Sequence, residues 1–225
     1  MEWAVALLSI ITVNLLLSGD NALVIALASR KLPPDQQKKA VFWGGAGAIA
    51  LRVVLTLVAI VLLKIPYLQL LGGLALLLIA IKLLAGDDSQ EELEAKNSLG
   101  EAIKTIIVAD MVMSIDNVIA IAAVAKGNFL LLIIGLSISI PIIIWGSKAI
   151  RLLMERWPIV VTIGAAFLGW TAGEMAIADK KIMPVLEQYF WSHWAIPLSF
   201  AIIVVIVGFT LNNRKRLNNE QKDNR

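Results

Sequence analysis

The sequence contains no cysteine and a single histidine, His193, and both shortages limit the chemistry open to the chain. Without cysteine there is no disulfide, no thiolate metal site and no thiol redox reaction. Charged residues make up only 16% of the 225 residues, whereas 59% are hydrophobic and the mean hydropathy is +0.81. This composition excludes an ordinary soluble domain. The few basic residues cluster between apolar runs, so nothing supports nucleic-acid binding.

Most of the sequence consists of long stretches of apolar residues. Seven of them match the length that a helix needs to cross a bilayer core of roughly 30 Å, and lipid requires each to satisfy its backbone hydrogen bonds internally. We therefore predict an all-α polytopic membrane protein with seven transmembrane helices. The first is retained rather than cleaved, because it lacks the basic start of a signal peptide. The expected spans are residues 3–28, 41–63, 66–85, 102–125, 129–149, 158–177 and 195–211.

Lysine and arginine are divided unequally between the two sides of the expected membrane. Fifteen of the 20 fall on one side and four on the other, and the remaining one, Arg52, lies in the middle of a span. The positive-inside rule then places the N-terminus outside and the C-terminus in the cytoplasm. Residues 86–101 become an acidic cytoplasmic linker, and residues 212–225 a basic cytoplasmic tail.

One polar motif occurs twice. VNLLLSGDNALVIALASR at residues 13–30 aligns without gaps on ADMVMSIDNVIAIAAVAK at residues 109–126. The match includes the serine, the aspartate and the asparagine in the middle of each stretch. Chance is a poor explanation, and an internal duplication is expected.

A weaker echo extends the duplication to three helices per copy, because residues 71–82 resemble residues 168–179. The repeats are then residues 1–85 and 102–178, with 195–211 as an appended seventh helix. An odd number of spans per copy places the second copy upside down in the membrane. In transporters, such inverted repeats hold the substrate near the midplane where the two halves meet.

Each copy of the motif places an aspartate and an asparagine inside an otherwise apolar span. A carboxylate at the bilayer centre costs roughly 2.5–3.5 kcal/mol, which makes it a functional-site candidate. In each copy, the residues three and seven positions before the asparagine are also polar, and on a regular helix they lie on the same face as that asparagine. The aspartates sit roughly 100° from that face, so we expect unwinding at Gly19 to let the set converge. The candidate metal ligands are Asp20, Asn21, Asp116, Asn117, Ser18, Ser114, Asp110 and Asn14.

Two further charged residues lie at depth. Arg52 in the second span needs an acidic partner, for which Asp20, Asp110 and Asp116 are candidates. Glu174 in the sixth span is a further possible metal ligand. Together these four acids and one arginine carry a formal charge of −3, which would hold protons or a cation.

The available ligands constrain the ion. Carboxylate, amide and hydroxyl oxygens, without cysteine or membrane histidine, suit hard divalent ions such as Mn²⁺, Ca²⁺ or Mg²⁺ better than Zn²⁺ or Cu⁺. The expected partners are such an ion and the lipid bilayer, with no prosthetic group. A proton could replace the metal on the return step, because two aspartates would share the emptied site. A purely structural alternative is that the polar groups only hold helices together.

The motifs SGDNALVIALASRKLP and MVMSIDNVIAIAAVA, with Arg52 in WGGAGAIALRVV, resemble those of the TerC family of bacterial integral membrane proteins, and of its YjbE-type branch within the LysE transporter superfamily. The resemblance extends to about residue 211. It implies a metal-ion transporter rather than an enzyme, specifically a manganese exporter of the bacterial cytoplasmic membrane.

Two other classes stay open. An intramembrane aspartyl protease also needs two membrane aspartates, but its Gly-x-Gly-Asp and Pro-Ala-Leu signatures are missing here. A non-transporting accessory subunit would associate with another machine and show no ion flux when purified alone.

The topology can be tested directly, because the chain has no cysteine of its own. Single cysteines placed within residues 31–39 should react with an impermeant reagent from the cytoplasmic side, and those within residues 126–128 from the outer side. Labelling of both segments from the same side would refute the predicted orientation of the repeats.

Overall fold

The computed structural model describes residue 11 and residues 19–62, 65–85, 95–125, 129–186, 188–189 and 191–223. Across these residues every regular element is a helix, which confirms the predicted all-α class. The helices are α2 (Gly19–Ser29), α3 (Pro34–Leu62), α4 (Leu68–Ala85), α5 (Ala95–Ala125), α6 (Phe129–Arg156), α7 (Ile159–Ile177), α8 (Met183–Leu186) and α9 (Ser192–Asp223).

The long helices overlap the predicted spans, and some continue past them. The helix α3 starts at Pro34, because proline suits a first helical turn, and Asp35 follows there, where a negative charge is favourable. Four described segments are long and apolar enough to cross a membrane, and Asp20–Ser29 is a shorter apolar helix. The four are Pro34–Val58, Leu68–Ala85, Ile159–Ile177 and Ser192–Arg214. The chain is thus a multi-pass membrane protein, and the count of seven spans stays a prediction.

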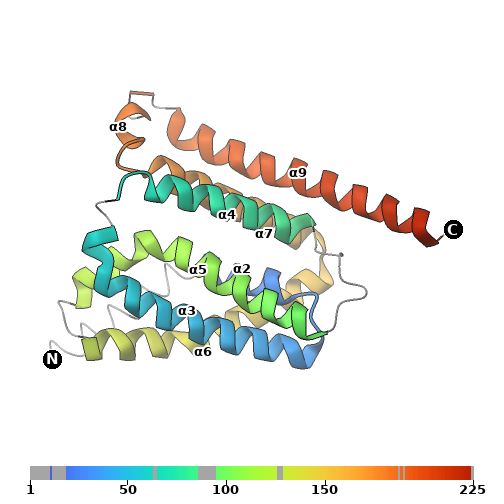
Figure 1. Ribbon diagram of the computed structural model, residues 1–225, viewed down its shortest axis with the longest axis horizontal. Coiled ribbons are helices and arrows are strands. Elements are labelled where there is room, and N and C mark those ends of the chain that lie inside the picture. Colours follow the sequence, from blue (N-terminus) through green and yellow to red (C-terminus); the bar gives the residue numbers. More distant parts are fainter. Residues whose placement is uncertain are drawn as a thin grey trace.

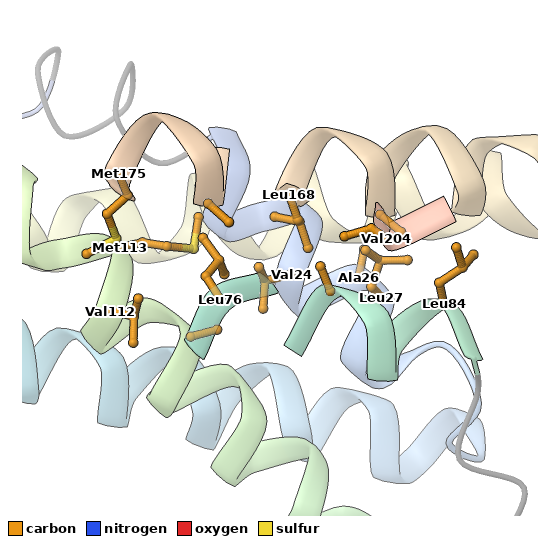
Figure 2. Close-up of a cluster of buried hydrophobic side chains, with 14 of the residues drawn as sticks. Val24, Ala26, Leu27, Leu76, Leu84, Val112, Met113, Leu168, Met175 and Val204 are labelled. Atoms are coloured by element: carbon orange, nitrogen blue, oxygen red, sulfur yellow. The ribbon is translucent and has the colours of Figure 1, made fainter. Parts of the chain in front are cut away.

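The helices form two groups (Figure 1). One consists of α4, α7 and α9, which pack on one another; in the other, α3 packs on α5, and α2 packs on both α5 and α6. Apolar side chains from both groups meet in one buried cluster (Figure 2). The cluster includes Val24 and Leu27 of α2, Leu76 of α4, Val112 and Met113 of α5, Leu168 and Met175 of α7, and Val204 of α9.

Small residues let the backbones of α4, α7 and α9 approach closely. A Cβ atom added to Gly73 of α4 would lie 2.5 Å from the carbonyl oxygen of Ala172 and 3.0 Å from the amide nitrogen of Ala176, both on α7. A Cβ added to Gly173 of α7 would lie 2.5 Å from the Cα of Pro197 on α9. Close approach of this kind is how helices associate in lipid, where apolar side chains gain little by leaving the solvent.

Helices α3 and α5 also pack closely, and they run in parallel. A Cβ on Gly44 would lie 2.9 Å from the Ile106 side chain, and one on Gly47 would lie 2.6 Å from the Cδ1 atom of Ile107. The contacts advance along both helices together. The next step in this register brings Arg52 of α3 against α5, at the second copy of the polar motif.

Gly73→Ala should destabilise the protein, because its methyl group has no flexible side chain to push aside, only the α7 backbone. Overpacking of this kind costs about 1–3 kcal/mol. Gly45→Ala is the matched control, since a Cβ there meets nothing within 4 Å and alanine favours a helix. Thermal unfolding in detergent should show a lower midpoint for Gly73→Ala only. Equal midpoints for the two variants would contradict the close contact.

Candidate functional site

The first copy of the motif lies at the start of α2. The helix begins at Gly19, and Asp20 occupies its first turn, where its Oδ1 atom accepts a hydrogen bond of 2.8 Å from the backbone N–H of Asn21. Asn14 and Ser18 lie outside the described residues, so the unwinding expected at Gly19, the first residue of α2, stays a prediction.

Asn21 is buried without hydrogen bonds to its side chain. Asn21 is only 3% exposed, yet neither its side-chain amide oxygen nor its amide nitrogen has a hydrogen-bond partner within the described part of the chain. A buried polar group left in this state costs about 1–3 kcal/mol and calls for an explanation, such as an ion or ligand. The amide oxygen is therefore available for coordination.

The second copy of the motif lies inside a continuous helix. The helix α5 runs without interruption through Ile115, so it has no counterpart of the helix start at Gly19. Isoleucine resists the non-helical dihedrals that glycine adopts readily. Asp116 and Asn117 belong to this helix, and their side chains lie outside the description. α2 packs against α5, which brings the helices carrying the two motif copies into contact.

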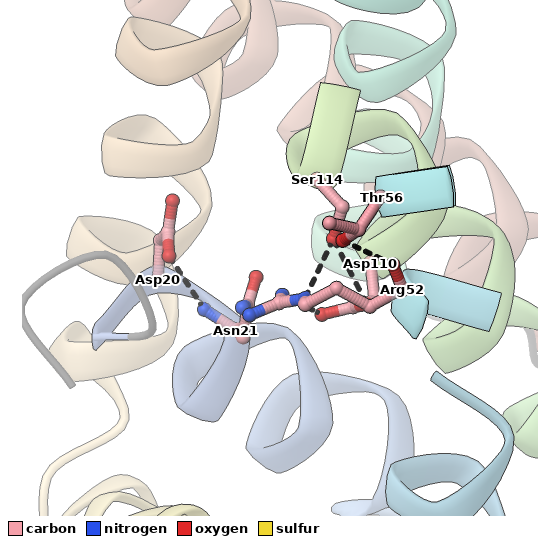
Figure 3. Close-up of polar contacts among 6 residues, drawn as sticks. All are labelled: Asp20, Asn21, Arg52, Thr56, Asp110 and Ser114. Atoms are coloured by element: carbon pink, nitrogen blue, oxygen red, sulfur yellow. Dashed lines mark hydrogen bonds and ion pairs between the residues drawn. The ribbon is translucent and has the colours of Figure 1, made fainter. Parts of the chain in front are cut away.

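Arg52 is the centre of a buried polar network that joins α3 to α5 (Figure 3). Its guanidinium Nη2 lies 2.5 Å from Oδ1 of Asp110, and its Nε donates a hydrogen bond of 2.9 Å to the Ser114 hydroxyl. That hydroxyl in turn donates to Oδ2 of Asp110 at 3.1 Å. Arg52 is only 2% exposed, and a charge buried to this degree needs a partner of opposite charge. Asp110 is therefore the acidic partner that the sequence predicted for it.

The network changes the role of two predicted ligands. Both carboxylate oxygens of Asp110 are engaged, and the Ser114 hydroxyl binds the same pair. In Figure 3 the Arg52 side chain points toward Asn21, with Asp20 on the other side of Asn21. The aspartate of the first motif therefore faces a pair with no net charge.

Glu174 lies apart from this arrangement, exposed on α7. Within the described residues, no three His, Cys, Asp or Glu side chains are grouped so as to hold a metal. Asp116, whose side chain is outside the description, is the carboxylate on which a two-aspartate site depends. The described half of the predicted site is thus Asp20 with the Asn21 amide.

Asp179 is a buried carboxylate that the sequence did not single out. It is 2% exposed and follows α7, where it accepts hydrogen bonds from the backbone N–H groups of Lys181 at 2.9 Å and Leu70 at 3.4 Å. Leu70 is in the first turn of α4, whose N–H groups lack helical partners. Asp179 therefore joins two helix ends. Its position after the last apolar residue of a span is the one signal that could have indicated a cap.

Residues 1–216 match the sequence model of the integral membrane protein TerC family. The chain belongs to the TerC family. Among its relatives is the uncharacterized membrane protein YjbE of Bacillus subtilis (strain 168), which is 40% identical over 92% of this chain and 95% of its own length.

More distant relatives share the same sequence region. The uncharacterized membrane protein YkoY of Bacillus subtilis (strain 168) is 27% identical over 99% of this TerC-family chain and 78% of its own length. The UPF0053 protein YegH of Escherichia coli (strain K12) is 27% identical over 95% of this chain but only 43% of its own. No solved structure matches the chain.

Thermal stability can distinguish the Asn21 amide, which has no hydrogen-bond partner among the described residues, from polar groups that hold the fold together. Asn21→Leu should leave the unfolding midpoint of the ion-free protein unchanged or raise it, because it removes a buried group without partners. Ser114→Ala should lower the midpoint, since it breaks bonds to both Asp110 and Arg52. Thermal unfolding in detergent with a chelator measures both. A large loss of stability in Asn21→Leu alone would mean that its amide is structural.

Proposed function

We propose that this protein is a transporter of divalent metal ions that exports Mn²⁺ across the bacterial cytoplasmic membrane in exchange for protons. The observation that carries the proposal is the Asn21 amide, buried and without hydrogen-bond partners, directly beside the Asp20 carboxylate. An oxygen of this kind next to an acid in an apolar bundle is suited to a cation. Among the described residues, the Asn21 amide makes no hydrogen bond that would hold helices together.

The ion would lie between α2 and α5. Asp20 and Asn21 supply a carboxylate and an amide oxygen from α2, and the second copy of the motif offers Asp116 and Asn117 on α5, which α2 contacts. Two carboxylates balance the charge of a divalent ion, and neutral amide oxygens complete its shell without adding charge. Ser18 stays a proposed ligand, whereas Ser114 is bound to the Arg52 pair.

The pattern of helix packing supports an inverted repeat. In such a repeat, α2 corresponds to α5, α3 to α6 and α4 to α7. The packing of α3 on α5 then corresponds to that of α2 on α6, and both occur. The packing of α4 on α5 corresponds in the same way to that of α2 on α7, and both of these also occur. The contacts α2 with α5, α3 with α6, and α4 with α7 map onto themselves, and all three are present. Transport would proceed by movement of the group of helices that carries the motif copies against the group of α4, α7 and α9, around the shared ion.

Membership of the TerC family supports a membrane transporter in general. The choice of a hard divalent ion follows from the oxygen ligands. The choice of manganese follows from the resemblance of the two motifs, and the orientation with the N-terminus outside follows from the positive-inside rule. Protons are the proposed counter-ion, because each emptied carboxylate can accept one.

Flux into proteoliposomes containing only this protein is the test of the proposal. Mn²⁺ transport should be present for the parent protein and fall to the rate of empty liposomes in Asp20→Asn and in Asp116→Asn, since each variant removes a charge while keeping the side-chain volume. Asp35→Asn is the matched control, because that aspartate is exposed at the start of α3. It should transport at the parent rate.

Two results would contradict the proposal in different ways. Parent-rate transport by a folded Asp20→Asn or Asp116→Asn protein would refute the shared site. Absence of flux for every divalent ion in the purified parent would instead favour the accessory-subunit alternative.

A further inference from the structure

We propose that the Arg52 guanidinium is a built-in cation that withholds Asp110 from the ion site and thereby fixes the site's charge at the value that suits a divalent ion. The inference rests on the proposed function, and it assigns Arg52 as the residue that sets selectivity by ion charge. It predicts that removing Arg52 makes cations bind more tightly, which is the opposite of damage to a purely structural pair.

The geometry shows why Asp110 is withheld. The Arg52 guanidinium takes one carboxylate oxygen of Asp110, and the Ser114 hydroxyl takes the other while also accepting a bond from Arg52. All three residues are buried. A guanidinium cannot lose its proton in a protein, so its charge stays in place under all working conditions.

The pair is fixed in position by the helices that carry it. On α3, Gly44 and Gly47 hold the backbone close against Ile106 and Ile107 of α5, in the same parallel register that leads to Arg52. The Arg52 main chain is itself braced, because its carbonyl oxygen accepts a 2.7 Å hydrogen bond from the Thr56 hydroxyl. The backbone that carries the guanidinium is therefore held close to the helix that carries Asp110.

The charge of the site follows from this pairing. With Arg52 and Asp110 cancelling, the proposed site of Asp20 and Asp116 carries a formal charge of −2, which one divalent ion would neutralise. Without Arg52, the Asp110 carboxylate would add a third negative charge, and −3 suits a trivalent ion. The Arg52 side chain points toward Asn21, the neighbour of Asp20 (Figure 3), and in a poorly polar interior a change of one unit charge outweighs small differences in ligand geometry.

The decisive experiment measures binding of Tb³⁺ and Mn²⁺ to the purified full-length protein in detergent at one fixed pH. Tb³⁺ is read by its luminescence, and Mn²⁺ by competition against it. In Arg52→Gln, we expect the dissociation constant for Tb³⁺ to fall roughly tenfold or more, and that for Mn²⁺ to fall by less, because the added charge acts more strongly on the trivalent ion.

Three further variants make the result specific to charge. Arg52→Lys keeps the cation and should keep the parent preference. Asp110→Asn leaves Arg52 without its acid and should weaken binding of both ions. The double variant Arg52→Gln/Asp110→Asn returns the site to −2 and should restore the parent ratio of the two dissociation constants. If Arg52→Gln does not fold, the comparison of Asp110→Asn with the double variant still tests the proposal.

The outcomes separate this inference from the function on which it rests. A parent protein that binds neither ion overturns the proposed transport function, and the inference with it. A parent that binds Mn²⁺, with Arg52→Gln binding Tb³⁺ equally or less well, overturns the inference alone. So does a double variant that binds no better than Asp110→Asn.

Discussion

The buried ion pair between Arg52 and Asp110 is the interaction on which the polar half of the molecule depends. A single charge in such an apolar bundle is unfavourable, and breaking a buried pair by removing one partner typically costs about 3–5 kcal/mol. The pair therefore requires a fixed register between α3 and α5, which the glycine contacts supply. Within the described residues it also leaves the side-chain amide of Asn21 on α2 buried without a hydrogen-bond partner.

The two groups of helices differ in the contacts that hold them together. In α4, α7 and α9 the backbones touch at Gly73 and Gly173, and Asp179 joins the ends of α4 and α7. The buried polar network and both copies of the motif lie instead among α2, α3 and α5. A backbone-to-backbone contact tolerates little movement, so we expect the first group to act as the scaffold against which the second group responds to an ion.

The sequence predicted the all-helical class because apolar length indicates a membrane helix almost by itself, whereas the count of seven spans stays a prediction. It predicted that Arg52 needs an acid, but it could not choose among three aspartates, since that choice depends on how α3 is rotated and set against α5. The exposure of Glu174 and the role of Asp179 depend in the same way on partners from other helices. Sequence periodicity along one helix carries no information about such partners.

Locating a bound ion tests the account most directly. Anomalous scattering at the manganese edge, from crystals of the full-length protein grown with Mn²⁺, reports the ion's position without reference to activity. The account predicts a peak between α2 and α5, within coordination distance of the Asp20 carboxylate and the Asn21 amide oxygen, with Asp110 still paired to Arg52. A manganese peak bonded to Asp110, or one placed only in the acidic segment 86–101, would contradict it.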